Sequence, residues 1–202
     1  VAVSSLDPAA FAALPEFFDI IIAAVPCSGE GMFRKDSRAR EQWSVDNVAL
    51  CAQRQRRIVA DVWPALRPGG LFIYSTCTFN RQENDGNVEW IRDNLGAGVL
   101  DLPLGYEGLI ATEYGCSLVP GFVPGEGQYC AALRKEGEPS LRGARTPGRA
   151  RPVRTADRRS ADCVGSLFGI PVSVRSKGDL LPALPACISA GLQEFETALP
   201  LL

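Results

Sequence analysis

Two cysteines stand where two apolar runs of the chain end, and their thiols are the groups best suited to chemistry. Cys27 lies in PCSGEG (26–31), which follows the apolar run 19–25, and Cys77 lies in STCTFN (75–80), which ends a second such run. In an open α/β sheet, loops at the carboxyl ends of neighbouring strands meet at one edge, where ligands bind. We therefore expect the two thiols to lie close together, placed for nucleophilic or redox chemistry.

The other cysteines and the absence of histidine narrow this chemistry. The chain has no histidine and no CxxC pair, and its seven cysteines stand at positions 27, 51, 77, 116, 130, 163 and 187. This pattern argues against a zinc site and a disulfide framework, and we expect most of these thiols to be small buried side chains. Because histidine is missing, any proton transfer must use Cys, Asp, Glu, Lys or a solvent path.

The elements that position the two thiols follow from the apolar pattern. Residues 19–25 are apolar on both faces, as in the middle of a covered parallel sheet. Ser44 can cap a long helix, whose inward face carries Val48, Ala52, Val59, Val62 and Leu66. LRPGG (66–70) predicts a turn, and LFIYS (71–75) predicts a second buried strand. Strand, helix and strand together predict a right-handed βαβ unit.

Two later elements complete the predicted α/β fold. The segment ENDGNVEWIRDNL (83–95) has the spacing of a helix with Val88 and Ile91 inward. The segment GQYCAALRK (127–135) alternates weakly and predicts a late strand, antiparallel to the others.

Composition and charge limit the class of protein. The 202 residues are 46% apolar and 22% charged, as in a soluble globular protein of one domain, or one domain plus part of another. No apolar run approaches the roughly 20 residues that span a bilayer, and the first residues lack a secretory signal, so we expect a cytoplasmic protein without a membrane partner. The net charge is −2, but residues 142–159 hold seven arginines and one acid, Asp157. This segment is either a solvated linker or a flexible arm attracted to phosphates.

Short motifs around the two thiols occur in an order typical of one enzyme family. They cover roughly residues 1–136 and are FD (18–19), PCSGEGMFRKD (26–36), QRQ (53–55), LRPGG (66–70), YSTCTFN (74–80), the E-N-D…W run (83–90) and GEGQY…LRK (125–135). In these motifs the sequence resembles the Sun/RsmF-type RNA cytosine-C5 methyltransferases. The resemblance implies the C-terminal half of a Rossmann-like methyltransferase sheet, S-adenosylmethionine as the cofactor, rRNA or tRNA as the substrate, and no metal.

The resemblance also implies roles for individual residues. The cysteine of the TCT motif, here Cys77, is similar to the family's nucleophile, which adds to C6 of cytosine. The cysteine of PCSG, here Cys27, is similar to the one that helps to release the product. Since a free thiol has a pKa near 8.5, we expect Cys77 to be activated by a helix N-terminus or a nearby cation. By their position just beyond the loop of Cys27, Arg34 and Lys35 either contact an RNA phosphate or form a solvated charged cluster.

The sequence departs from the family pattern on the cofactor side. Asp7 and Pro26 resemble residues beside the cofactor, but Ala24 replaces the Asp of the family's D-x-P-C motif. No glycine-rich loop follows a strand before residue 19, and SLVPGFVP (117–124) replaces a segment that usually holds a histidine. We therefore expect these 202 residues to carry half of a cofactor site.

The expected domain organisation has three parts. Residues 1–136 form a partial methyltransferase core, and residues 137–162 form an Arg/Pro/Gly-rich linker. Residues 163–202 resemble the start of the family's C-terminal RNA-binding region. Both ends of the chain thus resemble cut edges of a longer enzyme.

Three functions stay open at this point. The first is an RNA cytosine-C5 methyltransferase. The alternative is a non-catalytic RNA-binding or structural remnant of such an enzyme, favoured by Ala24 and the missing glycine-rich loop. A thiol redox protein is the third, although no CxxC pair supports it.

Overall fold

The computed structural model describes residues 5–102, 105–138, 172–174 and 183–185. These residues fall into two compact units, of which one is Pro8–Leu141 and holds both cysteine loops. The other holds an antiparallel pair of short strands, β7 (Val172–Val174) and β8 (Ala183–Pro185). Most of the predicted linker (137–162) and of the predicted C-terminal region (163–202) lies outside the described residues.

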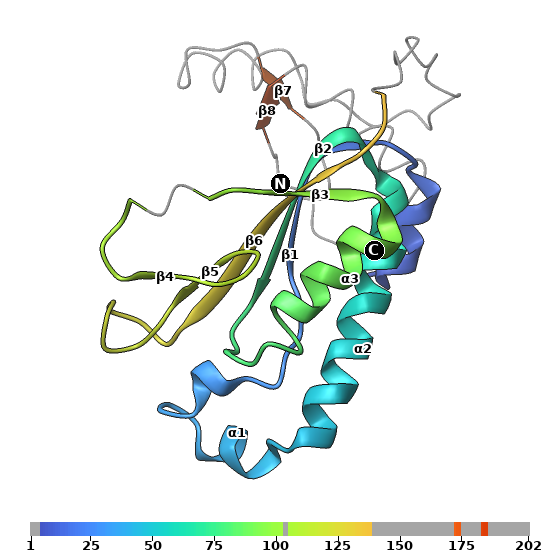
Figure 1. The fold of residues 1–202 in the computed structure, drawn as a ribbon. Coiled ribbons are helices and arrows are strands. Elements are labelled where there is room, and N and C mark those ends of the chain that lie inside the picture. Colours follow the sequence, from blue (N-terminus) through green and yellow to red (C-terminus); the bar gives the residue numbers. More distant parts are fainter. Residues whose placement is uncertain (1–4, 103–104, 139–171, 175–182, 186–202) are drawn as a thin grey trace. The chain divides into compact units, whose positions relative to one another are not determined.

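The Pro8–Leu141 unit is a mixed sheet with helices (Figure 1), which confirms the predicted α/β class. In chain order, with η for a 3₁₀ turn, its elements are η1 (Pro8–Ala13), β1 (Phe18–Ala24), η2 (Glu30–Met32), α1 (Ser37–Gln42), α2 (Val45–Val62), η3 (Trp63–Ala65), β2 (Leu66–Thr76), α3 (Asp85–Leu95), β3 (Ala97–Leu100), β4 (Leu109–Ala111), β5 (Cys116–Leu118) and β6 (Gln128–Lys135). The strand order is β1-β2-β6-β5-β4, and β3 also pairs with β6. None of the described helices is long and apolar enough to cross a bilayer.

The predicted strand–helix–strand unit is confirmed. β1 and β2 form a parallel pair, and α2 lies between them in the chain. α2 begins where expected, because the Ser44 hydroxyl accepts a hydrogen bond from the Asn47 N–H at 3.1 Å and so caps the helix. β6 runs antiparallel to β2, as the segment 127–135 predicted.

The prediction of a turn at residues 66–70 is wrong, because these residues begin β2. Phe18 pairs with Leu66, but the next pair is Ile20 with Leu71, so β2 bulges opposite β1. Pro68, which has no N–H, and Gly69, whose φ is 74°, are both tolerated at a bulge. The turn-like sequence therefore marks an irregularity inside a strand.

One face of the sheet is covered by α2 and α3, which lie side by side (Figure 1). Val88 and Ile91 of α3 are fully buried, as predicted for the helix over 83–95, which begins at Asp85 in the structure. The core between helices and sheet includes Val59, Phe72, Tyr74, Val88, Ile91 and Leu133.

The other face of β1 is exposed, which corrects the prediction of a strand covered on both faces. Ile20 is 56% exposed and Ile22 is 72% exposed. Within the described part of the chain β1 is the edge strand, and no strand pairs with its outer side. An apolar run can be buried on both faces only where neighbouring elements supply both layers.

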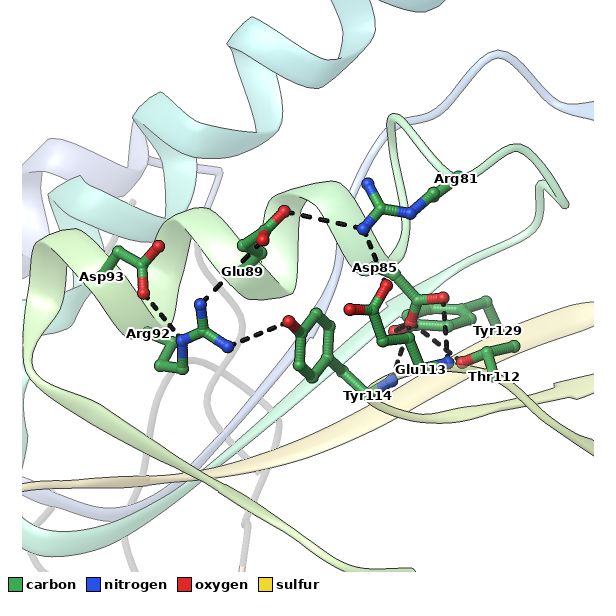
Figure 2. A network of polar contacts seen from close by, with 9 residues as sticks. All are labelled: Arg81, Asp85, Glu89, Arg92, Asp93, Thr112, Glu113, Tyr114 and Tyr129. Carbon is green, nitrogen blue, oxygen red and sulfur yellow. Dashed lines mark hydrogen bonds and ion pairs between the residues drawn. The ribbon is translucent and has the colours of Figure 1, made fainter.

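Asp85, in the first turn of α3, holds the hairpin of β4 and β5 against this helix (Figure 2). Its carboxylate accepts hydrogen bonds from the Tyr129 hydroxyl at 2.7 Å, the Thr112 hydroxyl at 2.9 Å and the Tyr114 N–H at 3.2 Å. The negative charge is also favourable at a helix N-terminus. One buried carboxylate thus joins α3, β6 and the turn between β4 and β5.

We expect Asp85→Ala to lower the free energy of unfolding by about 3 kcal/mol, because the buried hydroxyl of Tyr129 and the half-buried donors of Thr112 and Tyr114 lose their acceptor. Asp93→Ala is the matched control, since this side chain also lies on α3 but is 53% exposed, and we expect little change. Urea denaturation of both variants measures the difference. Equal stability of the two variants would show that Asp85 does not hold the hairpin.

Candidate active site

The loops that follow β1 and β2 bring the two predicted thiols into contact. Cys27 Sγ and Cys77 Sγ lie 2.9 Å apart, and either thiol can donate the hydrogen bond to the other. Both side chains are half-buried. The expectation that the two thiols share one edge of the sheet is confirmed.

Gly31 allows this close approach of the two loops. Its N–H donates to the Cys77 carbonyl at 2.9 Å. A Cβ at this position would lie 2.9 Å from the Cys77 carbonyl oxygen and 2.8 Å from the Glu126 carbonyl oxygen, closer than real Cβ atoms come. Only glycine therefore lets the loop after β1 dock on the loop after β2 and on the segment before β6.

Glu30 joins the same two loops through its carboxylate. It accepts hydrogen bonds from the Phe79 N–H at 2.7 Å, from Asn80 Nδ2 at 3.1 Å and from Trp43 Nε1 at 3.1 Å. Partial burial by itself would raise the pKa of Glu30, but these donors lower the pKa below its ordinary value. The carboxylate is therefore a stable acceptor for the loop that carries Cys77.

A second carboxylate, that of Glu83, is fully buried between the two loops. It accepts hydrogen bonds from the Ser28 N–H at 3.0 Å, Gln55 Nε2 at 2.7 Å and Asn80 Nδ2 at 2.8 Å. The Ser28 hydroxyl also donates to Glu83 and lies 3.1 Å from the Thr78 hydroxyl. Glu83 thus contacts Ser28, which follows Cys27, and Asn80, which lies three positions after Cys77.

Glu83, Gln55 and Asn80 were not predicted as site residues from the sequence. One signal was present: Gln55 falls on the inward face of α2, between the buried residues Ala52 and Val59. A polar side chain at such a position needs a buried hydrogen-bond partner.

The contact between the thiols separates their pKa values. The hydrogen bond from Cys27 lowers the pKa of Cys77 to about 7, against the opposing effects of burial and of the carboxylates of Glu83 and Glu126. The same hydrogen bond, together with burial, raises the pKa of Cys27 above its ordinary range. Cys77 is therefore the thiol that ionises near neutral pH. Its activation comes from the second thiol, whereas the sequence predicted a helix N-terminus or a cation.

Arg34 and Lys35, predicted to contact an RNA phosphate, bind the segment before β6. Arg34 Nη2 donates to the Gly125 carbonyl at 3.1 Å, and Lys35 Nζ forms an ion pair with Glu126 at 3.0 Å. The Lys35 side chain remains 64% exposed. Both residues thus tie this segment to the loop of Cys27, and their contact with RNA stays a prediction.

The residues predicted to contact the cofactor are Pro26 and Asp7. Pro26 is exposed, and its carbonyl accepts a hydrogen bond from Gln55 Nε2 at 2.9 Å. Asp7 lies outside the Pro8–Leu141 unit. The cofactor roles of both residues stay predictions.

The described residues at the carboxyl end of β1 do not by themselves fit S-adenosylmethionine. Binding of such a nucleoside needs a carboxylate for the ribose and a glycine-rich turn at a helix N-terminus. Ala24 is exposed there and offers only a methyl group. The nearby carboxylates of Glu30 and Glu83 already accept hydrogen bonds from the two cysteine loops.

The remaining cysteines among the described residues are ordinary packed side chains. Cys51 and Cys116 are buried and Cys130 is half-buried, and burial raises the pKa of each. Cys163 and Cys187 lie outside the described residues. Within the part of the chain that the structure describes, no group of three His, Cys, Asp or Glu side chains could hold a metal ion.

The chain is similar in sequence to known proteins. Over 141 residues the chain is 41% identical to the ribosomal RNA small subunit methyltransferase F of Citrobacter koseri, an alignment that covers 67% of this chain and 29% of the relative. It is 42% identical over 141 residues to the protein of the same name from Escherichia fergusonii, and this alignment covers 67% of this chain and 29% of that relative. The chain therefore spans less than a third of the length of these relatives.

A solved structure supports the fold. The crystal structure of PH0851 superposes with a TM-score of 0.54 and 24% sequence identity over 60% of this chain and 27% of that one. The model of the family 16S rRNA methyltransferase RsmB/F matches residues 2–134, which include both cysteine loops. Because this match covers more than half of the chain, the chain belongs to the RsmB/F methyltransferase family.

Proposed function

We propose that this chain forms part of an RNA cytosine-C5 methyltransferase that acts on rRNA or tRNA in the cytoplasm. The observation that carries the proposal is the 2.9 Å contact between Cys27 and Cys77 within the RsmB/F segment. The names of the curated relatives support rRNA as the substrate. S-adenosylmethionine, when bound, would supply the methyl group.

In this proposal the Cys77 thiolate begins the reaction by adding to C6 of the cytosine ring. C5 is by itself a poor nucleophile, and the new S–C6 bond moves electron density onto it, so that a hard step is split into easier ones. The pKa of about 7 supports this role, because a large share of Cys77 is then ionised at neutral pH. An unperturbed thiol would be only a few per cent ionised there.

Cys27 assists the release of the product. When the proton at C5 leaves to solvent, the C5–H electron pair forms the C5–C6 double bond, and the S–C6 bond breaks with its electrons on Cys77 Sγ. The Cys27 thiol lies in contact with this sulfur, and its raised pKa keeps its proton in place. Its S–H can therefore stabilise the departing thiolate by the same hydrogen bond.

The second candidate is a non-catalytic RNA-binding or structural remnant of such an enzyme, favoured by Ala24. This alanine is exposed, and the resemblance implies that it replaces the Asp of the D-x-P-C motif. A remnant would keep the fold and the contact between the thiols but would not methylate. Covalent trapping of RNA separates the two candidates.

RNA that contains 5-fluorocytosine is expected to form a covalent complex through Cys77. The test protein is a chimera in which residues 2–134 replace the matching segment of the Citrobacter koseri relative. Fluorine at C5 cannot leave as a proton does, so the S–C6 bond persists, and a denaturing gel detects the adduct. Cys77→Ala should form no adduct, whereas the control Cys51→Ala should form it. An adduct in Cys77→Ala would contradict the assignment, and none in the parent chimera would favour the remnant.

Cys27→Ala in the same chimera should accumulate an adduct with unmodified RNA several-fold above the parent level. Addition needs only the Cys77 thiolate, but its expulsion needs the proton that Cys27 holds beside it. The comparison is made at about pH 9, where an unperturbed thiol is largely ionised even without its partner. A level of adduct equal to that of the parent would give Cys27 a purely structural role.

The isolated 202-residue chain is expected not to bind S-adenosylmethionine tightly, because it has no glycine-rich loop before β1 and an alanine at position 24. Isothermal titration calorimetry measures this directly. Ala24→Asp alone should not restore binding, whereas the chimera should bind. A dissociation constant in the low micromolar range for the isolated chain would show that the cofactor site lies elsewhere in it.

A further inference from the structure

We propose that Glu83 is a positioning residue for the two cysteines, because its buried carboxylate joins the loop that carries Cys27 to the loop that carries Cys77. The inference rests on the proposed function only in that the positioned thiols serve methyl transfer. The positioning itself is a property of the folded chain without RNA or cofactor.

The surroundings of Glu83 fix where its carboxylate lies. The side chain is 0% exposed, and no lysine or arginine among the described residues forms an ion pair with it. Four hydrogen bonds reach its oxygens, from the N–H and hydroxyl of Ser28, from Gln55 and from Asn80. A buried carboxylate without a cation is stable only when such donors surround it. Any movement of the carboxylate away from them is therefore costly.

The backbone of Glu83 is held as firmly as its side chain. Its N–H donates to Asn80 Oδ1 at 2.9 Å, and its carbonyl accepts from the Tyr74 hydroxyl at 2.7 Å. The same hydroxyl lies 3.0 Å from Gln55 Oε1, and Asn87 Nδ2 donates to that oxygen at 2.7 Å. Strand β2, helix α2 and helix α3 thus share one polar network with Glu83 at its centre, and such a satisfied network is rigid.

This network ends next to both thiols. Ser28 is bonded directly to Cys27 in the chain, and Thr78 is bonded directly to Cys77. The Ser28 hydroxyl donates to Glu83 and lies 3.1 Å from the Thr78 hydroxyl, so both loops meet at this carboxylate. Glu83 touches neither sulfur. It sets their separation through the residues that follow them.

Position and charge at Glu83 act on Cys77 in opposite directions. The carboxylate's charge raises the pKa of Cys77, as does that of Glu126, which is itself paired with Lys35. The hydrogen bond from Cys27, which the network preserves, lowers the pKa of Cys77 and is the larger effect. Loss of charge alone would therefore lower the pKa, and loss of position would raise it.

Glu83→Gln in the full 202-residue chain tests whether the pKa of Cys77 rises, as loss of position predicts, or falls, as loss of charge alone predicts. An amide at this place puts an NH₂ group among donors, so it cannot hold all four hydrogen bonds. Iodoacetamide alkylation of Cys77 is followed against pH by mass spectrometry of the peptides, which separates the seven cysteines. The parent chain should show a midpoint near pH 7. The midpoint of the variant should shift upward, toward the ordinary pKa of a thiol. Alkylation at neutral pH should then be about tenfold slower.

Two further variants keep the test decisive if Glu83→Gln does not fold, as judged by circular dichroism. Ser28→Ala removes the hydroxyl between Glu83 and Thr78 but keeps the Ser28 N–H. It should therefore shift the midpoint upward by less than Glu83→Gln does. Glu89→Gln is the control, because this acid lies on α3 with its side chain 40% exposed and pairs with arginines, and it should leave the midpoint unchanged. An unchanged or lower midpoint in folded Glu83→Gln, or in Ser28→Ala if the former is unfolded, would overturn the proposal.

A second measurement reads the separation of the sulfurs directly. Diamide accepts two electrons and two protons from a pair of thiols and leaves a disulfide, so its rate of joining Cys27 to Cys77 depends on their contact. Glu83→Gln should slow this rate severalfold, whereas loss of charge alone would speed it by favouring the thiolate. Neither measurement uses RNA or cofactor. Failure of covalent trapping in the chimera, with these shifts intact, would therefore contradict the proposed function and leave the role of Glu83 standing.

Discussion

The parallel pairing of β1 with β2 is the constraint on which the rest of the site depends. The strands run in register as far as Ala24 and Ser75, and the Val25 N–H continues the ladder to the Ser75 carbonyl at 3.1 Å. Cys27 follows Ala24 by three positions, and Cys77 follows its partner Ser75 by two. Short steps of similar length from the last paired residues bring both thiols to the same edge of the sheet. Their 2.9 Å contact follows from this register.

Beyond the sheet edge, the loops are held together by hydrogen bonds rather than by apolar packing. The segments around the cysteines consist mostly of glycine and polar residues, so few carbon atoms are available to pack there. Two carboxylates, Glu30 and Glu83, supply acceptors, and the backbone and amides of the facing loop supply donors. Among the described residues, Trp63 Nε1 is the one buried side-chain nitrogen or oxygen without a partner. A network satisfied to this degree permits one arrangement of the loops.

This arrangement has an electrostatic consequence. Carboxylates that organise the loops also disfavour a thiolate beside them, as the effects of Glu83 and Glu126 on Cys77 illustrate. The second thiol compensates, because its S–H hydrogen bond stabilises the Cys77 thiolate more than the carboxylates destabilise it. Two cysteines in contact can therefore produce a reactive thiol in a site without histidine, against the effect of two nearby carboxylates.

Features that depend on nearby residues could be predicted from the sequence. The Ser44 cap, the inward face of α3 and the parallel pair β1–β2 follow from local spacing, which the tertiary structure preserves. The turn predicted at 66–70 was wrong because Pro and Gly mark irregular backbone but do not say whether a strand continues past it. The prediction that β1 is covered on both faces was wrong, because burial of its second face depends on elements other than β1 itself.

The sequence alone determined that two cysteines end neighbouring strands, since strand propensity and loop composition depend on consecutive residues. Only the tertiary structure decided which acids organise the site. Glu83 binds Ser28 and Gln55, which are 55 and 28 positions away, and Asp85 binds Tyr129, 44 positions away. An acidic residue has the same local sequence whether water or protein donors surround it, so the distant donors decide its role. The pKa of Cys77 is likewise set by a thiol 50 positions away, which the fold brings into contact.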